Sequence, residues 1–265
     1  MHPLLNIAVK AARKAGTTIS RYADRVDSVA VTSKNANDFV TEVDLLAEQD
    51  IIETIKEAYP DHEILAEESG HEGKSDVVWI IDPLDGTTNF MHGFPQYAVS
   101  IGVQVNGELD QAVIYDPFKQ ELFTASKGNG ATVDGRKMRV TDRKTLDGAL
   151  LGTGFPFKNQ EILDTYLEMF KDIFSESSGV RRAGSAALDL AYVAAGRLDG
   201  FWEIGLKPWD MAAGALMIKE AGGIITDFSG KDNYLESGNV IAGNLKLHAQ
   251  LEGKVYPYIQ KLTAK

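Results

Sequence analysis

Two aspartates stand three residues apart directly after an apolar run in residues 77–92, which read VVWIIDPLDGTTNFMH. The run from Val77 to Ile81 predicts a strand covered on both faces, because it is rich in β-branched residues and shows no polar alternation. Asp82 follows at the carboxyl end of this strand, where α/β sheets place their ligands. Pro83 is expected to end the strand and to turn the backbone, so that Asp82 and Asp85 face one point.

Asp82, Asp85 and the carbonyl of Leu84 between them form a set of hard oxygen ligands. Such a set suits Mg²⁺, which takes few ligands from a protein and keeps water and substrate phosphate in its other positions. The residues 86–88, Gly-Thr-Thr, follow at an expected helix start and offer backbone N–H groups and hydroxyls to an anion. Asp-Pro and Asp-Gly are also common turn dipeptides, so either aspartate alone could be a turn residue. The whole string predicts that a metal ion and a phosphate meet here.

The composition excludes several kinds of site. The 265 residues are 44% hydrophobic and 25% charged, as in an ordinary soluble globular protein. The absence of cysteine excludes disulfides, thiolate metal sites and cysteine nucleophiles, and the five histidines are scattered singly, so a metal would have to be held by oxygen. The net charge of −11 argues against a broad nucleic-acid footprint and requires cations between clustered acids and a phosphate.

No sequence feature divides the chain or attaches it to a membrane. It has no apolar run of about 18 residues and no export or lipidation signal, which favours a cytoplasmic protein. Because repeats, low-complexity tracts and linkers are absent, we expect one domain over 1–265, with subregions at roughly 1–145 and 146–265. Alternation with period two in 97–140 predicts an antiparallel meander, and helical spacing predicts a first helix over 4–19.

A polar loop precedes a predicted helix that begins at Thr41. Thr41 and Asp44 have the spacing of a capping box, and this local role would by itself explain both residues. In the loop, Asp38 can be a simple loop end, and Lys34 is a solvated cation placed where it could approach an anion. The apolar face of the helix is predicted to comprise Leu45, Ile52, Ile55 and Tyr59.

Three further acids stand at the ends or starts of predicted elements. Glu67 ends the strand EILAEES, and a short return loop could bring it beside Asp82, unless it is a solvent-exposed surface acid. Glu203 is expected to be exposed at the end of a short strand. Asp210 lies in the first turn of a helix, where complementing the helix dipole would also explain it. Ser185 is predicted to cap a small-residue helix whose N-terminus could bind an anion or a hydroxyl.

Four segments together resemble the inositol monophosphatase family of Mg²⁺-dependent, lithium-sensitive phosphatases, and the resemblance covers nearly the whole chain. They are EES at 67–69, DPLDGTTNF at 82–90, GSAALDLAYVAAG at 184–196 and PWDMAAG at 208–214. The N-terminal MHPLLNIAVKAARKAG and the run TGFPFK are similar to the bacterial SuhB-type members, which are implicated in ribosomal RNA transcription antitermination through RNA polymerase and Nus factors. The implied fold is of the α/β (α+β) class, a layered α/β/α/β/α sandwich of the inositol monophosphatase and fructose-1,6-bisphosphatase type.

The resemblance also implies which residues hold metal, phosphate and substrate. Two to three Mg²⁺ ions are implied, the first on Glu67, Asp82 and the Leu84 carbonyl, the second on Asp82, Asp85 and Asp210, and a weaker third on Glu67 and water. Phosphate would bind Gly86 and Thr87, and the inositol hydroxyls would bind Asp85, Ser185, Ala186 and Glu203. Accessory candidates are Lys34, Asp38, Thr41, Asp44 and Arg181.

The implied activity is hydrolysis of inositol 1-phosphate to inositol and phosphate by metal-activated water, in a homodimeric enzyme. Glu67 and Thr87 would orient and deprotonate the water, and Asp85 completes the catalytic set. The same metal core would also serve fructose 1,6-bisphosphate or 3′-phosphoadenosine 5′-phosphate.

A different alternative is a transcription antitermination factor that binds RNA polymerase and Nus factors through protein contacts. Arg181, Arg182 and the basic residues of the first helix are candidates for such contacts. Neither membrane attachment nor direct sequence-specific binding of nucleic acid is expected.

Overall fold

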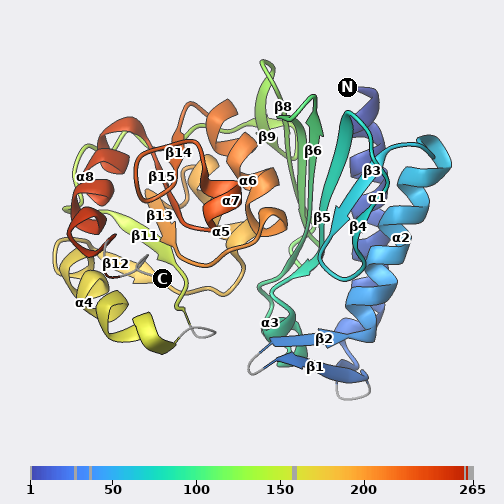
Figure 1. The fold of residues 1–265 in the computed structure, drawn as a ribbon, viewed down its shortest axis with the longest axis horizontal. Helices are drawn as coiled ribbons and strands as arrows, with labels where there is room; N and C mark the ends of the chain where they lie inside the picture. Colours follow the sequence, from blue (N-terminus) through green and yellow to red (C-terminus); the bar gives the residue numbers. More distant parts are fainter. Residues whose placement is uncertain (1, 27–28, 36–37, 157–159, 260, 262–265) are drawn as a thin grey trace.

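The computed structural model describes residues 2–26, 29–35, 38–156, 160–259 and 261, with the backbone alone for 33–35, 38, 39 and 160. These residues form five layers in the order α/β/α/β/α, as the resemblance implies (Figure 1). Within the described residues, none of the helices combines the length and the apolar character that a membrane crossing requires.

The first two layers are a helix pair and an eight-stranded sheet. α1 (Pro3–Ala23) and α2 (Glu42–Ala58) pack side by side and bury their apolar faces on the sheet. The strand order is β10-β9-β8-β7-β6-β5-β3-β4, and β6 to β10 form the expected antiparallel meander. The strands are β3 (Glu63–Ala66), β4 (Gly70–Glu72), β5 (Val77–Asp85), β6 (Ala98–Val105), β7 (Glu108–Asp116), β8 (Glu121–Ser126), β9 (Gly130–Val133) and β10 (Arg136–Lys137).

The middle layer consists of α5 (Ala186–Ala194) and α6 (Pro208–Glu220), which pack on each other and on both sheets. Small residues allow this close packing. A β-carbon at Gly214 would lie 2.4 Å from the β-carbon of Leu190, so glycine brings the α5 and α6 backbones together. The two helices therefore lie between the sheets and connect them (Figure 1).

The last two layers are a five-stranded sheet and the helices that cover it. Its order is β12-β11-β13-β15-β14, and α4 and α8 lie on its outer side (Figure 1). These elements are β11 (Leu150–Thr153), α4 (Leu163–Phe174), β12 (Gly179–Arg181), β13 (Gly200–Glu203), β14 (Ile224–Thr226), β15 (Val240–Gly243) and α8 (Leu245–Val255). The remaining elements are β1 (Val31–Asn35), β2 (Asp38–Thr41), α3 (Thr87–Met91), α7 (Tyr234–Ser237) and the 3-10 helices η2 (Gln160–Ile162) and η3 (Tyr256–Tyr258).

Two local expectations are wrong. Pro83 does not end β5, because Asp82 pairs with Ser100 and Asp85 with Ala98, which leaves one extra residue on β5 as a bulge. In α2, Leu45 is 53% exposed, and the buried apolar side chains are instead Val43, Ala47, Ile51 and Ile55. The prediction for Leu45 was wrong because apolar residues also occur on the outer face of α2. The sequence pattern is therefore compatible with two different apolar faces.

Candidate active site

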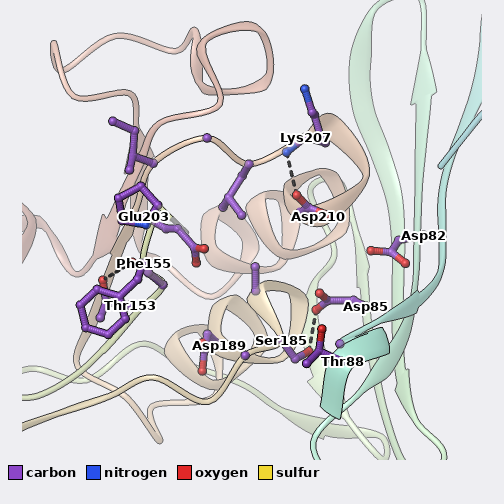
Figure 2. Close-up of a pocket in the computed structure, with 18 of the residues that line it drawn as sticks. Asp82, Asp85, Thr88, Thr153, Phe155, Ser185, Asp189, Glu203, Lys207 and Asp210 are labelled. Atoms are coloured by element: carbon purple, nitrogen blue, oxygen red, sulfur yellow. Dashed lines mark hydrogen bonds between the residues drawn. The ribbon is translucent and has the colours of Figure 1, made fainter. Parts of the chain in front are cut away.

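Three carboxylates from two elements, β5 and α6, meet in one cluster. Asp82 and Asp85 flank the bulge of β5, and Asp210 lies in the first turn of α6 (Figure 2). One oxygen from each lies within 4.8 Å of the others. They line a cavity of about 730 Å³ whose walls come from both sheets and from α3, α5 and α6.

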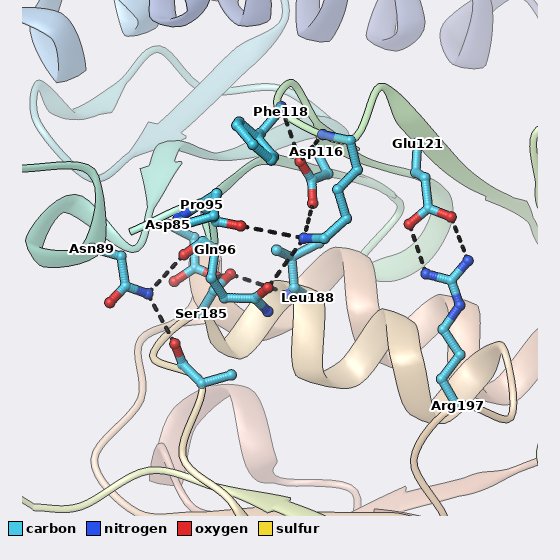
Figure 3. Close-up of polar contacts among 12 residues, drawn as sticks. Asp85, Asn89, Pro95, Gln96, Asp116, Phe118, Glu121, Ser185, Leu188 and Arg197 are labelled. Atoms are coloured by element: carbon cyan, nitrogen blue, oxygen red, sulfur yellow. Dashed lines mark hydrogen bonds and ion pairs between the residues drawn. The ribbon is translucent and has the colours of Figure 1, made fainter. Parts of the chain in front are cut away.

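Local hydrogen bonds hold each of the three carboxylates in place. Asp82 accepts from the N–H of Leu84 at 3.0 Å, across the bulge. Asp210 accepts from the N–H of Lys207 at 2.7 Å, so it caps the start of α6 and also takes a place in the cluster. Asp85 accepts from the hydroxyl of Ser185 at 2.6 Å and therefore links β5 to the start of α5 (Figure 3).

A second link between the β5–α3 region and the start of α5 runs beside Asp85. The Asn89 side-chain amide donates to the carbonyls of Gln96 at 2.7 Å and Ala183 at 2.9 Å (Figure 3). The N–H of Ala187 adds a bond of 2.8 Å to the Asp85 carboxylate. Since both links join the β5–α3 turn to the N-terminus of α5, the turn and the helix have a fixed relative position.

The carboxylates destabilise one another's charge. Burial raises the pKa of Asp82 well above its usual value, and the neighbouring charges of Glu67, Asp85 and Asp210 raise it further. Burial also raises the pKa of Asp85 to about 6, against the opposing effect of its hydrogen bond from Ser185. A set of oxygen donors that repel one another at this spacing fits a divalent cation, and it matches the preference of Mg²⁺ for hard ligands.

Glu67 lies next to Asp82 because β3 and β5 run parallel and Ala66 pairs with Ile81. The N–H of Glu67 continues the ladder by donating to Ile81 at 3.1 Å, and Glu67 lines the cavity. The turn after Glu67 is held by Glu48 of α2, a buried acid that the sequence analysis missed. Its carboxylate accepts from the N–H groups of Glu68 at 2.8 Å and Ser69 at 2.7 Å. The only sequence signal was the position of Glu48, one helical turn after Asp44.

The start of α3 brings a second network to the cluster. Gly86 has φ of 100°, and a β-carbon there would lie 2.8 Å from the Gln96 carbonyl, so both backbone and space require glycine. The Thr87 hydroxyl lies 2.8 Å from Asp44 Oδ1 and 3.1 Å from the Leu84 carbonyl. Asp44 is buried, and its capping box with Thr41 is confirmed. Asp44 thus caps α2 and also fixes the Thr87 hydroxyl.

The far wall of the cavity is formed by α5, β11 and β13. Ser185, Ala186 and Glu203 line it, and Glu203 is half-buried rather than exposed. Burial raises the pKa of Glu203 well above its usual value, and the charges of Asp189 and Asp210 add to the effect. Asp189 also lines the cavity and was missed, although an acid inside an apolar small-residue helix was a visible signal.

The accessory candidates differ in how close they lie to the cavity. The backbones of Lys34 and Asp38 belong to β1 and β2, but their side chains lie outside the part that the structure describes. Arg181 is exposed on β12 and does not line the cavity, whereas its neighbour Arg182 does. Thr41 does not line the cavity and is linked to the site through its hydrogen bonds to Asp44.

This fold and this acid cluster define a class of metal-dependent phosphatase, and a model of the inositol monophosphatase family matches residues 1–264. The chain belongs to the inositol monophosphatase family, which confirms the family predicted from its sequence.

Individual relatives agree with this assignment. The chain is 54% identical over 265 residues to the Nus factor SuhB of Pseudomonas aeruginosa, with 98% of each chain covered. It is similar to the crystal structure of the extragenic suppressor protein suhB from Bartonella henselae, with a TM-score of 0.93, 44% identity, and 96% and 98% of the two chains covered. It is also similar to the inositol monophosphatase from Anabaena (Nostoc), with a TM-score of 0.86, 41% identity, and 96% and 95% covered.

Proposed function

We propose that the protein is an Mg²⁺-dependent phosphomonoesterase that hydrolyses inositol 1-phosphate to inositol and phosphate. The observation that carries this proposal is the cluster of Asp82, Asp85 and Asp210, with oxygens within 4.8 Å, beside the N–H groups at the start of α3. Family membership supports the phosphatase class, and the hydroxyl-binding groups of the far wall support a polyol as the substrate.

Two to three ions would be held by the residues that the family resemblance implies. The first would have Glu67, Asp82 and the Leu84 carbonyl as ligands. The second would have Asp82, Asp85 and Asp210, and a weaker third would have Glu67 and water. The chemistry supplied by bound Mg²⁺ is neutralisation of the phosphoryl oxygens, activation of water and stabilisation of the leaving alkoxide.

The chain's own residues then place the reactants. The N–H groups of Gly86 and Thr87 bind phosphate oxygens, since they are unpaired at the start of α3 in the helical pattern. Glu67 orients the attacking water. The Thr87 hydroxyl accepts a hydrogen bond from that water and directs its own proton to Asp44 Oδ1, 2.8 Å away, so that the buried Asp44 carboxylate is the final proton acceptor.

The substrate alcohol would lie between α5 and β13. Ser185, the Ala186 N–H, Asp85 and Glu203 offer hydrogen-bond partners to hydroxyl groups. A second phosphate on the substrate would meet the carboxylates of Asp189 and Glu203, and Arg182 offsets only part of that charge. This arrangement favours a neutral polyol over fructose 1,6-bisphosphate or 3′-phosphoadenosine 5′-phosphate.

A substrate panel tests this assignment. With saturating Mg²⁺, kcat/KM for inositol 1-phosphate should exceed that for the two substrates with a second phosphate by at least about 10-fold, because a like-charge contact costs more than about 1.4 kcal/mol. Release of phosphate is the measurement, and glycerol phosphate is the comparison for a small neutral alcohol. A preference for either substrate with two phosphates would contradict the assignment and would leave the metal chemistry intact.

A positioning role for Glu48 follows from the proposed ligand set. Glu48→Gln keeps the shape but loses the charge and one acceptor, so the turn that carries Glu67 should loosen. We expect the Mg²⁺ concentration for half-maximal activity to rise about 10-fold, as for other residues that orient metal ligands, with a smaller change in kcat at saturating Mg²⁺. The matched control is Glu57→Gln on the exposed face of α2, where the acid pairs with Lys10. A lower melting temperature with unchanged Mg²⁺ dependence would show that Glu48 only stabilises the fold.

A second function is supported by the name of the relatives. We propose that the protein also binds the transcription machinery, RNA polymerase or Nus factors, in the cytoplasm and as a homodimer. Because its net charge is −11, the contact should be made with protein rather than with RNA. In α1, Lys10 and Lys14 already pair with acids of α2, whereas Arg181 is exposed on β12 and is the candidate contact chosen for the test.

The test is a pull-down of RNA polymerase and NusA with wild type, Asp82→Asn and Arg181→Ala, with and without nuclease. Recovery by Asp82→Asn after nuclease, reduced by Arg181→Ala, would separate binding from hydrolysis. No recovery at low salt would leave the phosphatase as the sole function.

A further inference from the structure

Gly154 lies directly beside Glu203 on the neighbouring strand. β11 and β13 run parallel, and Thr153, the last residue of β11, pairs with Trp202, so the residues that follow are Gly154, just past β11, and Glu203 on β13. A β-carbon at position 154 would lie 1.8 Å from Glu203 Oε1 and 2.5 Å from Oε2. The carboxylate of Glu203 therefore occupies the space that any side chain at position 154 would take.

Backbone conformation does not explain this glycine. Gly154 does not have a positive φ, so residues other than glycine could adopt its backbone conformation. The backbone is also fixed in place. The buried Tyr166 hydroxyl donates to the Gly154 carbonyl, and the Thr153 hydroxyl donates to the Trp202 carbonyl at 2.7 Å. Because the strand cannot retreat, a β-carbon at 154 would displace the flexible end of Glu203.

Gly152, two residues earlier on β11, is a glycine for a different reason. A β-carbon there would lie 2.9 Å from Leu198 Cδ1 and 3.1 Å from Phe201 Cδ2, both in the buried core. Gly152 thus makes room for the core, whereas Gly154 makes room for a carboxylate of the cavity. Both Gly154 and Glu203 line the cavity, and Figure 2 shows the Glu203 carboxylate directed toward its interior.

We propose that Gly154 is a specificity-determining residue, whose missing side chain lets the Glu203 carboxylate lie against β11 and bind the hydroxyl groups of the substrate alcohol. This inference rests on the proposed function, in which Glu203 contacts the alcohol. The phosphate and metal groups lie on β5, α3 and α6 and directly after β3, so a change at Gly154 alters recognition of the alcohol and leaves the reacting groups in place.

The test is a double-mutant cycle of wild type, Gly154→Ala, Glu203→Ala and the double variant. Each is assayed with inositol 1-phosphate and with phenyl phosphate, whose leaving group carries no further hydroxyl. We expect Gly154→Ala to raise KM for inositol 1-phosphate up to about 10-fold, as for loss of one hydrogen bond, and to change phenyl phosphate hydrolysis less than about twofold. In the Glu203→Ala background, Gly154→Ala should have no further effect on KM.

Thermal unfolding provides the controls. Gly154→Ala should melt close to wild type, as should Gly253→Ala on α8, where a β-carbon meets nothing within 4 Å, whereas Gly152→Ala should melt lower. If Glu203→Ala changes the preference and Gly154→Ala does not, the inference fails and the role of Glu203 stands. If Glu203→Ala leaves the preference unchanged, the substrate assignment and the inference fail together. If Gly154→Ala lowers activity equally for both substrates, with Glu203 present and with Glu203→Ala, its role is structural and the inference is also overturned.

Discussion

Asp82→Asn and Asp210→Asn should each lower turnover by at least about 100-fold while the protein stays folded. A metal ion contributes several kcal/mol to the transition state, and each 1.36 kcal/mol is tenfold in rate. Asparagine at 210 still accepts the hydrogen bond from the Lys207 N–H, so α6 keeps its cap. The measurement is phosphate release across a range of Mg²⁺ concentrations, with Asp142→Asn, an exposed acid outside the cavity, as the control.

Asp82→Asn should stabilise the metal-free protein although it lowers turnover. Burial and three neighbouring acids raise the pKa of Asp82 in the folded state, so its ionisation destabilises the fold at any pH above the unfolded value of 3.8. Asp82→Asn should therefore raise the melting temperature of the metal-free protein at pH 8, and the gain should disappear near pH 3.5. Turnover within a few-fold of wild type at ordinary Mg²⁺ would rule out this carboxylate cluster as the metal site.

Thr87→Val should reduce kcat by about 100- to 10,000-fold, the range for loss of a positioned proton-transfer group. Valine matches the shape of threonine but removes the hydroxyl that lies 2.8 Å from Asp44. KM and the Mg²⁺ dependence should change far less, since the Thr87 N–H and the carboxylate cluster remain. Steady-state kinetics of phosphate release separate these parameters.

Thr87→Ser is the matched variant, because serine restores the hydroxyl with one methyl group fewer. It should recover most of the activity that valine loses. Equal activity for valine and serine would show that the hydroxyl takes no part in proton transfer, and that Thr87 serves only to bridge Asp44 and the Leu84 carbonyl.

The elements that the sequence predicts well depend on local patterns. The capping box of Thr41 and Asp44 spans three residues, and its hydrogen bonds form within one turn of α2. Glu67 lies beside Asp82 because the short connection between β3 and β5 left few alternatives for their pairing. The bulge at Pro83 could not be predicted in the same way, because it depends on the register of β6, whose pairing with β5 is set by the whole strand.

The residues that the sequence did not reveal act through distant partners. Glu48 bonds to N–H groups 20 and 21 residues away, and no pattern within α2 indicates that contact. Gly154 is explained only by Glu203, which belongs to another strand of the five-stranded sheet. Asp189 joins the cavity because α5 packs between the two sheets. Such roles follow from tertiary packing, so they become visible only once the layers are assembled.

The most direct test of the metal-dependent mechanism is phosphate release from inositol 1-phosphate as Mg²⁺ is titrated into chelator-treated protein. We expect no release above the uncatalysed rate without Mg²⁺, and a saturable rise as Mg²⁺ is restored, because the cluster of Asp82, Asp85 and Asp210 repels the substrate dianion until cations bind. Full activity in excess chelator would contradict the central claim that these carboxylates act by holding metal.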